Sequence, residues 1–176
     1  MRKAPVGVGL LAILLSLTSC AIGPSTGPTQ PSNGDPMTQT QAGLSVEDAK
    51  RIAQDTEDAI VKTLPTSMIA SVEQRKTGIL LPCGENREYQ WTGRTIVNLA
   101  PSATVEDVVS RVLSAYSDND ELRPRDITDS SGPAIQLLGP YDSGYIVGRR
   151  SDDAVDVASF SPCFNLPEGE SPILEY

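Results

Sequence analysis

The sequence contains no histidine among its 176 residues. Without an imidazole ring, neither a Ser-His-Asp nor a Cys-His catalytic arrangement can form, and the commonest metal ligand is missing. The chain also lacks a Gly-x-Ser-x-Gly elbow, a phosphate-binding glycine loop and a dinucleotide fingerprint, and no serine has a lysine three residues later. We therefore expect no cofactor, no metal site and no enzymatic activity of these classes.

Basic residues are scarce as well. The chain has 14 lysines and arginines against 23 acidic residues, and its formal net charge is −9. Removal of residues 1–19 would take away Arg2 and Lys3 alone among the charged residues, leaving a net charge of −11. Such a balance argues against a nucleic-acid partner and against a polybasic attraction to anionic lipid.

The first nineteen residues have the three parts of an export signal. Arg2 and Lys3 supply the positive start, and the run from Pro5 to Leu17 is almost wholly apolar. This run is shorter than the roughly 20 apolar residues that a membrane-spanning helix needs. Residues 1–19 are therefore predicted to be a signal peptide, and the chain is expected to leave the cytoplasm.

The end of the signal and the residue after it read Leu17-Thr18-Ser19-Cys20, which resembles the lipobox of bacterial lipoproteins, with cleavage before Cys20. In a lipobox, a branched apolar residue and two small residues precede an obligatory cysteine. The resemblance implies that the Cys20 thiol takes a diacylglyceryl group and becomes the new N-terminus, so that acyl chains hold the protein on the outer face of the cell membrane. An ordinary cleaved signal and an uncleaved apolar anchor are the alternatives.

Residues 20–43 are predicted to be a lipidated cysteine followed by a flexible tether. The segment is rich in proline, glycine, serine, threonine and glutamine and nearly lacks large apolar residues. It cannot bury enough surface to offset the entropy lost on ordering. Residues 44–165 are then predicted to form one domain, and residues 166–176, with Pro167, Gly169 and Pro172, a loose tail.

Two cysteines remain after Cys20. Cys83 and Cys163 form an even pair in an exported chain, where a disulfide is the usual state. The bridge would close a loop of about 80 residues, which the chain-entropy model values at roughly 4 kcal/mol. Two free thiols or a metal site are the alternatives, and two isolated cysteines without histidine make no zinc pattern.

Two helices are expected, over residues 45–64 and 104–117. Ser45 and Thr104 are each followed three residues later by an acid, as in a capping box, and apolar residues then recur at helical spacing. Pro65 ends the first helix. The acids of the first helix are assigned largely to its outer, solvated face: Glu47, Asp55, Glu57 and Asp58.

Strands are expected between and after the helices. Side chains alternate over 68–73 and over 89–99, and turn residues then divide three further strands at 134–138, 144–150 and 154–162. Residues 122–128 read as a weak strand, which Pro124 would place at an edge. The order predicts an α+β fold, with an antiparallel sheet of about five to six strands and two helices packed on one face.

Several of these features together resemble the LppA-type lipoproteins of actinobacteria. They are the export signal, the helix ending in Ile60-x-x-x-Leu64-Pro65, Cys83, the helix at 104–117, Gly144-Tyr145, and Ser161-Pro162-Cys163-Phe164. The match covers residues 44–165 by order and spacing. It implies location and fold only, because the biochemical role of that family is not established.

Candidate functional residues are few. Trp91, the single tryptophan, lies on an alternating strand and reads either as core or as a stacking platform for a sugar or peptide with Arg94, Tyr141 and Tyr145 nearby. Asp118-Asn119-Asp120 has oxygen ligands at alternate spacing, but Arg123 stands where a calcium loop needs glycine. The candidate acids for a carboxylate mechanism are ordinary turn residues: Asp118, Asp120, Asp126, Asp129, Asp152, Asp153 and Asp156.

Three functions are compatible with these observations. The favoured hypothesis is a non-enzymatic envelope lipoprotein that binds a partner protein or a cell-wall component. A carboxylate-based cell-wall glycoside hydrolase needs two acids about 5–9 Å apart in a cleft. A lipid carrier needs a large apolar cavity between helices and sheet, for which a domain with two helices leaves little volume.

Overall fold

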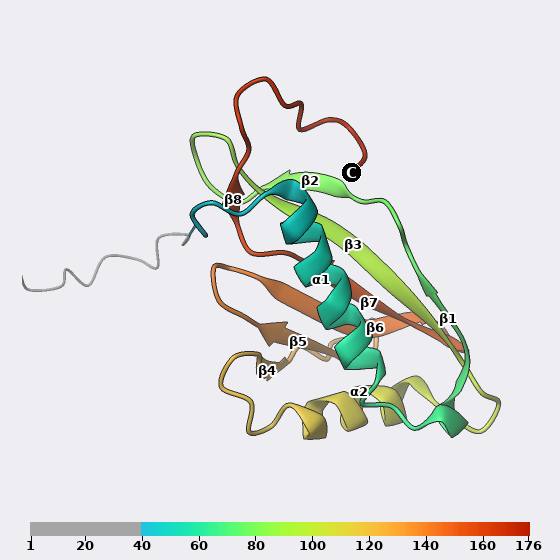
Figure 1. Cartoon of the computed structure of the whole chain (residues 1–176). Helices are drawn as coiled ribbons and strands as arrows, with labels where there is room; N and C mark the ends of the chain where they lie inside the picture. The colour runs from blue at the N-terminus through green and yellow to red at the C-terminus, as the bar shows by residue number, and fades with distance from the viewer. Residues whose placement is uncertain (1–39) are drawn as a thin grey trace, which may run out of the picture. The chain divides into compact units, whose positions relative to one another are not determined.

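The computed structural model describes residues 40–176. The predicted signal peptide, Cys20 and nearly all of the tether lie outside these residues. Eleven elements follow one another along the described chain (Figure 1). They are α1 (Val46–Val61), η1 (Thr66–Met68), β1 (Ile69–Gln74), β2 (Ile79–Pro82), β3 (Glu88–Leu99), α2 (Val105–Ala115), β4 (Arg123–Asp126), β5 (Ala134–Leu138), β6 (Gly144–Ser151), β7 (Ala154–Phe160) and β8 (Phe164–Asn165).

Both helices begin where their caps predict. The Ser45 hydroxyl accepts a hydrogen bond from the backbone N–H of Asp48 at 3.1 Å. At α2, Thr104 and Asp107 bond reciprocally, which completes a capping box and satisfies two amides that the first turn leaves free. Helix α1 ends at Val61, three residues before the expected end, because the chain tightens into a turn and a short 3-10 helix around Pro65.

The eight strands form one antiparallel sheet in the order β1-β3-β7-β6-β5-β4, with β2 and β8 also paired to β3. This confirms the predicted α+β class and antiparallel sheet, although the strand count exceeds the expected five to six. The additional strands are β2, of four residues, and β8, of two. Segments this short show no alternation long enough to recognise, and their pairing to the long strand β3 defines them.

The sheet has two different faces. On the face covered by both helices, which we call the helix face, valine side chains dominate a buried core (Figure 1). Helix α1 packs on β3 and β7, whereas α2 packs on β4, β5 and β6. The opposite face, here called the open face, has no helix against it in the described chain. The largest fully buried core side chains of the helix face and helices include Ile60, Val97, Val105, Val108, Val112, Ile135, Leu137, Tyr145 and Val147.

The last eleven residues differ from the expected loose tail. Leu166 is buried, and the Arg87 side chain donates hydrogen bonds to the carbonyl oxygens of Leu166, Pro167 and Glu170. At the end of the chain, the backbone of Tyr176 exchanges two hydrogen bonds with Gly78, at 2.8 and 3.0 Å. The proline and glycine content of residues 166–176 predicts a loose tail. The hydrogen bonds from the Arg87 guanidinium and the backbone pairing with Gly78 instead hold this segment against the domain.

The predicted disulfide between Cys83 and Cys163 is confirmed. Their Cα atoms lie 6.1 Å apart across a sequence separation of 80 residues. The bridge joins the end of β2 to the segment between β7 and β8. The first described residues lie at the same place, because the N–H of Gln41 donates to the carbonyl oxygen of Cys163 at 2.7 Å. The tether therefore enters the domain beside the disulfide.

Candidate functional site

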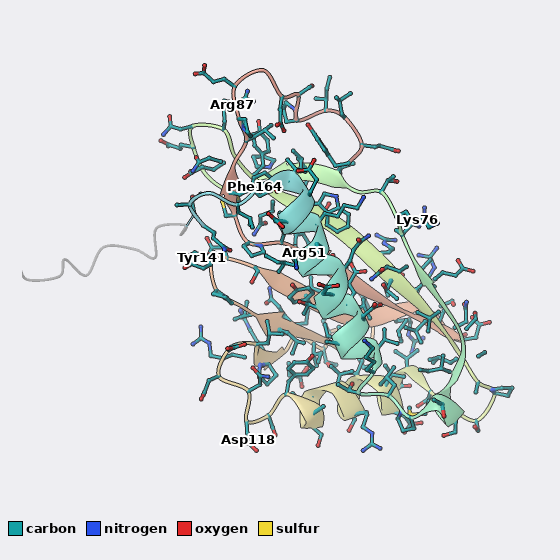
Figure 2. All side chains as sticks on the ribbon, in the orientation of Figure 1. Arg51, Lys76, Arg87, Asp118, Tyr141 and Phe164 are labelled. Carbon is teal, nitrogen blue, oxygen red and sulfur yellow. A yellow bond between two sulfur atoms is a disulfide. The ribbon has the colours of Figure 1, made fainter. Side chains whose placement is uncertain are left out.

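The structure does not bring together the four side chains that the sequence suggested as a binding platform. Trp91 and Tyr145 point to the helix face and are fully buried, so neither can stack on an external ligand. Arg94 lies on the open face, where its guanidinium is 3.3 Å from a carboxylate oxygen of Asp156. Tyr141 is 40 % exposed in the turn between β5 and β6 (Figure 2). For Trp91 the core interpretation is the correct one.

Trp91 is held by contacts from both ends of the domain. Its indole N–H donates to the carbonyl oxygen of Tyr176 at 3.2 Å. Its ring packs with Val46, Ala49 and Ala53 of α1 and with Phe164 of β8, and the Lys50 ammonium lies 6.0 Å from the ring centroid. Trp91 therefore centres a second, smaller core cluster that joins the helix start to the C-terminal segment.

Glu57 is the buried ionisable group that the sequence analysis placed on the wrong face. Its side chain is 0 % exposed, and its carboxylate accepts hydrogen bonds from the hydroxyls of Thr95, at 2.7 Å, and Ser159. The Gln74 amide adds a third at 3.3 Å. A signal was present, because Ala49, Ala53 and Glu57 follow each other at helical spacing on the buried side of α1.

Burial raises the pKa of Glu57 above its usual value, while the hydrogen bonds from Ser159, Thr95 and Gln74 oppose that shift. The neighbouring carboxylate of Asp58 raises the pKa further. Glu57 lines none of the surface hollows described below. In the described residues every buried side-chain nitrogen or oxygen has a hydrogen-bond partner. The carboxylate therefore joins α1 to β3 and β7.

The other candidate acids serve turns and ion pairs. Asp126 accepts a hydrogen bond from the N–H of Thr128 at 2.8 Å, which lowers the pKa of its carboxyl. Asp129 accepts from the N–H of Ser131 at 2.7 Å, and Asp152 pairs with Arg149 at 2.9 Å. Similar local partners hold Asp153, bonded by Ser151, and Asp156, paired with Arg94 and Arg150.

The Asp118-Asn119-Asp120 segment shows no cation cage. The Asn119 side-chain oxygen accepts hydrogen bonds from the N–H groups of Glu121 and Leu122, at 3.0 and 2.7 Å, so it faces its own backbone. Within residues 40–176 no group of three or more histidine, cysteine, aspartate or glutamate side chains is placed to hold a metal ion.

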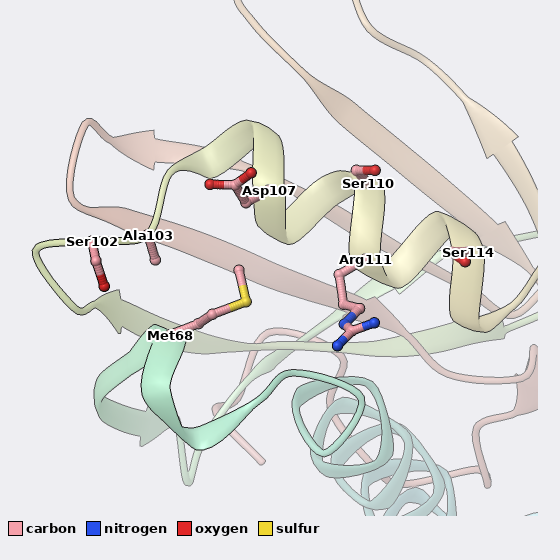
Figure 3. A pocket seen from close by; sticks show the side chains of 7 residues that line it. All are labelled: Met68, Ser102, Ala103, Asp107, Ser110, Arg111 and Ser114. Atoms are coloured by element: carbon pink, nitrogen blue, oxygen red, sulfur yellow. The ribbon is translucent and has the colours of Figure 1, made fainter.

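A hollow of about 430 Å³ lies between α2 and the η1 segment (Figure 3). Met68 lies at its centre, and Arg111 extends into it from α2. Asp107 also borders the hollow, but its carboxylate already closes the capping box. The hollow therefore offers one cation and few directed polar groups. Small side chains complete its border: Ser102, Ala103, Ser110 and Ser114.

The open face holds a more distinctive groove of about 430 Å³ across β5, β6 and β7. In the register of the sheet, Phe160 pairs with Gly144 and Gly144 pairs with Leu138. Gly144 has no side chain, so the space above it stays open between two large apolar neighbours. A Cβ atom built on Gly144 would meet only the Leu137 carbonyl oxygen, at 3.6 Å.

Polar groups border this groove on two sides. The Gln90 amide donates to the carbonyl oxygen of Asp142 at 2.6 Å and so ties β3 to the turn after β5. Gln136 and Ile146 form the neighbouring pair along the groove. A second hollow, of about 690 Å³, continues the groove past Arg123 towards the loop that follows α2. The groove is therefore apolar at its floor and polar at its borders.

Arginine side chains share the open face with the groove, and one of them, Arg123, borders it. Arg123 and Arg125 of β4 pair in register with Leu138 and Gln136, so their side chains share that face. Arg94 of β3 and Arg150 of β6 lie on the other side of the face. Both contact the carboxylate of Asp156 of β7, each at 3.3 Å. Arg123 and Arg125 make no ion pair within the described residues.

Comparisons with known proteins give little beyond this geometry. No family model and no curated protein matches the chain. Among solved structures, the crystal structure of a DUF4853 family protein from Actinomyces odontolyticus is similar, at 14 % sequence identity and a TM-score of 0.45. The similarity covers 77 % of this chain and 77 % of that chain. Neither helix among residues 40–176 is long and apolar enough to cross a membrane.

Proposed function

We propose that the protein is a lipid-anchored envelope protein whose disulfide-closed domain binds a partner without catalysing a reaction. The observation that carries the proposal is the Cys83–Cys163 bridge behind an export signal that ends in Cys20. A bridge of this kind persists in oxidising compartments, which agrees with export. Cys20 then remains as the one cysteine free for acylation.

The arrangement of the domain supports a tethered module. The chain enters beside Cys163, at one end of the sheet, and Thr40 bonds to the Glu88 carboxylate at 2.6 Å. Nineteen residues lie between Cys20 and Thr40, enough as a flexible coil to span roughly 25 Å. The open face is not covered by any helix of the described chain, so it is available to a partner.

The distribution of the acids favours binding over hydrolysis. A glycoside hydrolase needs one carboxyl with a raised pKa beside the scissile bond and a second carboxylate opposite it. Glu57 has a raised pKa but is enclosed between α1 and the sheet. The acids that border the hollows are all exposed to solvent, namely Asp107, Asp120, Glu121, Asp142 and Glu175.

The packing of the core disfavours a lipid carrier. Side chains of α1, α2 and the sheet interdigitate in one cluster, which leaves no described hollow between the helix layer and the sheet. The hollows of the described chain open to the surface. An acyl chain would need an enclosed apolar cavity to be removed from water.

The anchor is tested by replacing Cys20 with alanine in the full chain. We expect the C20A protein to accumulate in an unprocessed form, and metabolic labelling with a tagged palmitate to disappear. The matched control is the C83S/C163S double variant, which removes two cysteines and leaves labelling intact. Equal labelling and membrane association of the C20A protein would refute the lipid anchor.

A further inference from the structure

We propose that the open face binds an acidic segment of a partner protein, with an apolar side chain of that segment seated in the groove over Gly144. This inference rests on the proposed function as a binding module and specifies the partner of that module. It is carried by the register of the sheet, which places arginines on both sides of an apolar centre.

The charge of the open face is opposite to that of the chain. The chain has 23 acidic and 14 basic residues. The strand register nevertheless places only three acids, Glu73, Glu88 and Asp156, on the open face. The same face carries five arginines, spread from the end of β1 to the edge strand β4: Arg75, Arg94, Arg123, Arg125 and Arg150. Arg94 and Arg150 already pair with Asp156, so Arg123 and Arg125, which make no ion pair within the described residues, are the cations that an acidic partner would meet first.

One register row shows the spacing that a partner would meet. Arg94 pairs with Ala158, Ala158 with Ile146, Ile146 with Gln136, and Gln136 with Arg125. Four steps between strands at about 4.8 Å separate the two arginines by roughly 19 Å. An extended peptide advances about 3.4 Å per residue, so acids five or six residues apart match the two ends.

The centre of the face selects for apolar side chains. Phe160 and Leu138 are half-buried and flank the gap over Gly144. Towards the β2 edge the apolar surface continues with Ile79, which is 51 % exposed and pairs in register with Thr92. Each exposed apolar group of this face gains by leaving water when a complementary side chain covers it.

The arginines of the open face and the apolar groove over Gly144 together favour a polypeptide over other anionic partners. A phosphate-rich or uronic-acid polymer supplies charge, but it has no branched or aromatic side chain to fill the groove. An anionic bilayer would face the arginines, yet the net charge of −9 opposes approach of the whole domain. A protein segment with acids on either side of a leucine or phenylalanine satisfies both features.

The test uses the purified full chain in a non-ionic detergent and a fluorescein-labelled octapeptide. The peptide has two aspartates at each end, and the four residues between them are glycine, leucine, phenylalanine and glycine. Two control peptides replace either all aspartates with asparagine or both apolar residues with serine. Fluorescence anisotropy should show micromolar binding of the first peptide, at least tenfold weaker binding of both controls, and weakening with added salt.

Three variants locate the binding. R123S/R125S should weaken binding about tenfold or more and reduce its dependence on salt. G144L should weaken it by a similar factor with the salt dependence unchanged, because it fills the groove; G144A gives a smaller loss if G144L fails to fold. The matched control is R111S, which removes an exposed cation from the helix side and should change binding less than twofold.

Several outcomes would overturn the proposal. Equal binding of the asparagine peptide, or an equal loss in R111S, would refute charge recognition by this face. If polyphosphate or vesicles containing a third phosphatidylglycerol bind with the same sensitivity to R123S/R125S while the octapeptide does not bind, the partner is not a protein segment. Because the assay runs in detergent, loss of membrane anchoring in the C20A protein leaves this binding result intact and refutes the anchor alone.

Discussion

The carboxylate of Glu57 on α1 accepts a hydrogen bond from the hydroxyl of Thr95 on β3 at 2.7 Å, inside the interface of helix and sheet. Ser159 on β7 donates to the other carboxylate oxygen. The same acid therefore joins three elements that are far apart in the sequence. A charged group this deeply placed makes the stability of the fold depend on pH.

The direction of that dependence follows from the raised pKa of Glu57. Below the usual value of 4.5, the carboxyl is protonated in both the folded and the unfolded chain. Between 4.5 and the raised folded pKa, the unfolded chain releases the proton while the folded chain keeps it. The contribution of Glu57 to the free energy of unfolding therefore falls as pH rises through this window and is constant above it.

The variant E57Q removes this titration while keeping an oxygen that can accept from Thr95 and Ser159. We expect the difference in unfolding free energy between E57Q and the wild type to grow in favour of E57Q as pH rises above 4.5, by about 1 kcal/mol or more. Urea unfolding from pH 4 to pH 8 measures it. D55N, at an exposed position of the same helix, is the control, and a difference that does not vary with pH would contradict the prediction.

Loss of the disulfide should destabilise the domain strongly. For a bridge between residues 80 apart, the chain-entropy model gives a loss of roughly 4 kcal/mol. The C83S/C163S variant tests it by denaturant unfolding against the oxidised wild type, and reduction of the wild type should produce the same shift. A change below about 1 kcal/mol in both experiments would show that the loop is already constrained without the bridge.

The C-terminal residues should contribute to stability although they follow the last strand, β8, by several residues and form no helix or strand. Deletion of residues 173–176 removes the carbonyl partner of the Trp91 indole and the two backbone bonds to Gly78. We expect a loss of roughly 1–3 kcal/mol and a red shift of the emission of the single tryptophan. The control is I173S, since Ile173 is 90 % exposed, and an unshifted spectrum in the deletion variant would contradict the prediction.

Two glycines of the sheet should respond in opposite ways to the same change. A Cβ atom on Gly93 would overlap the ring of Trp91, which lies over it, whereas the space above Gly144 is open. We therefore expect G93A to lower the free energy of unfolding by about 1–3 kcal/mol through overpacking, and G144A to change it by less than about 0.5 kcal/mol. Thermal unfolding followed by circular dichroism compares the two, and equal effects would be inconsistent with this packing.

Local patterns of the sequence were enough for the helices and for most of the sheet. Ser45 and Thr104 mark the helix starts because capping depends on residues three positions apart. The alternation over residues 89–99 predicts a strand with one buried face, and the structure has it as β3 over Glu88–Leu99. The pairing of Cys83 with Cys163 followed from counting cysteines in an exported chain. The prediction that Cys20 is lipidated also depends on the sequence alone, since Cys20 lies outside the described residues.

Other features were decided only by the tertiary structure. The sequence predicts a solvated position for Glu57 because acids are usually exposed. The hydroxyls that donate to its carboxylate belong to Thr95 on β3 and Ser159 on β7, which are 38 and 102 residues away in the sequence. The tail looked loose because its partners, Gly78 and Arg87, lie about 80 to 100 residues earlier in the chain. Arg123 lies beside the groove over Gly144, and Arg94 and Arg125 end the neighbouring register row, through long-range strand pairing that no local pattern of residues encodes.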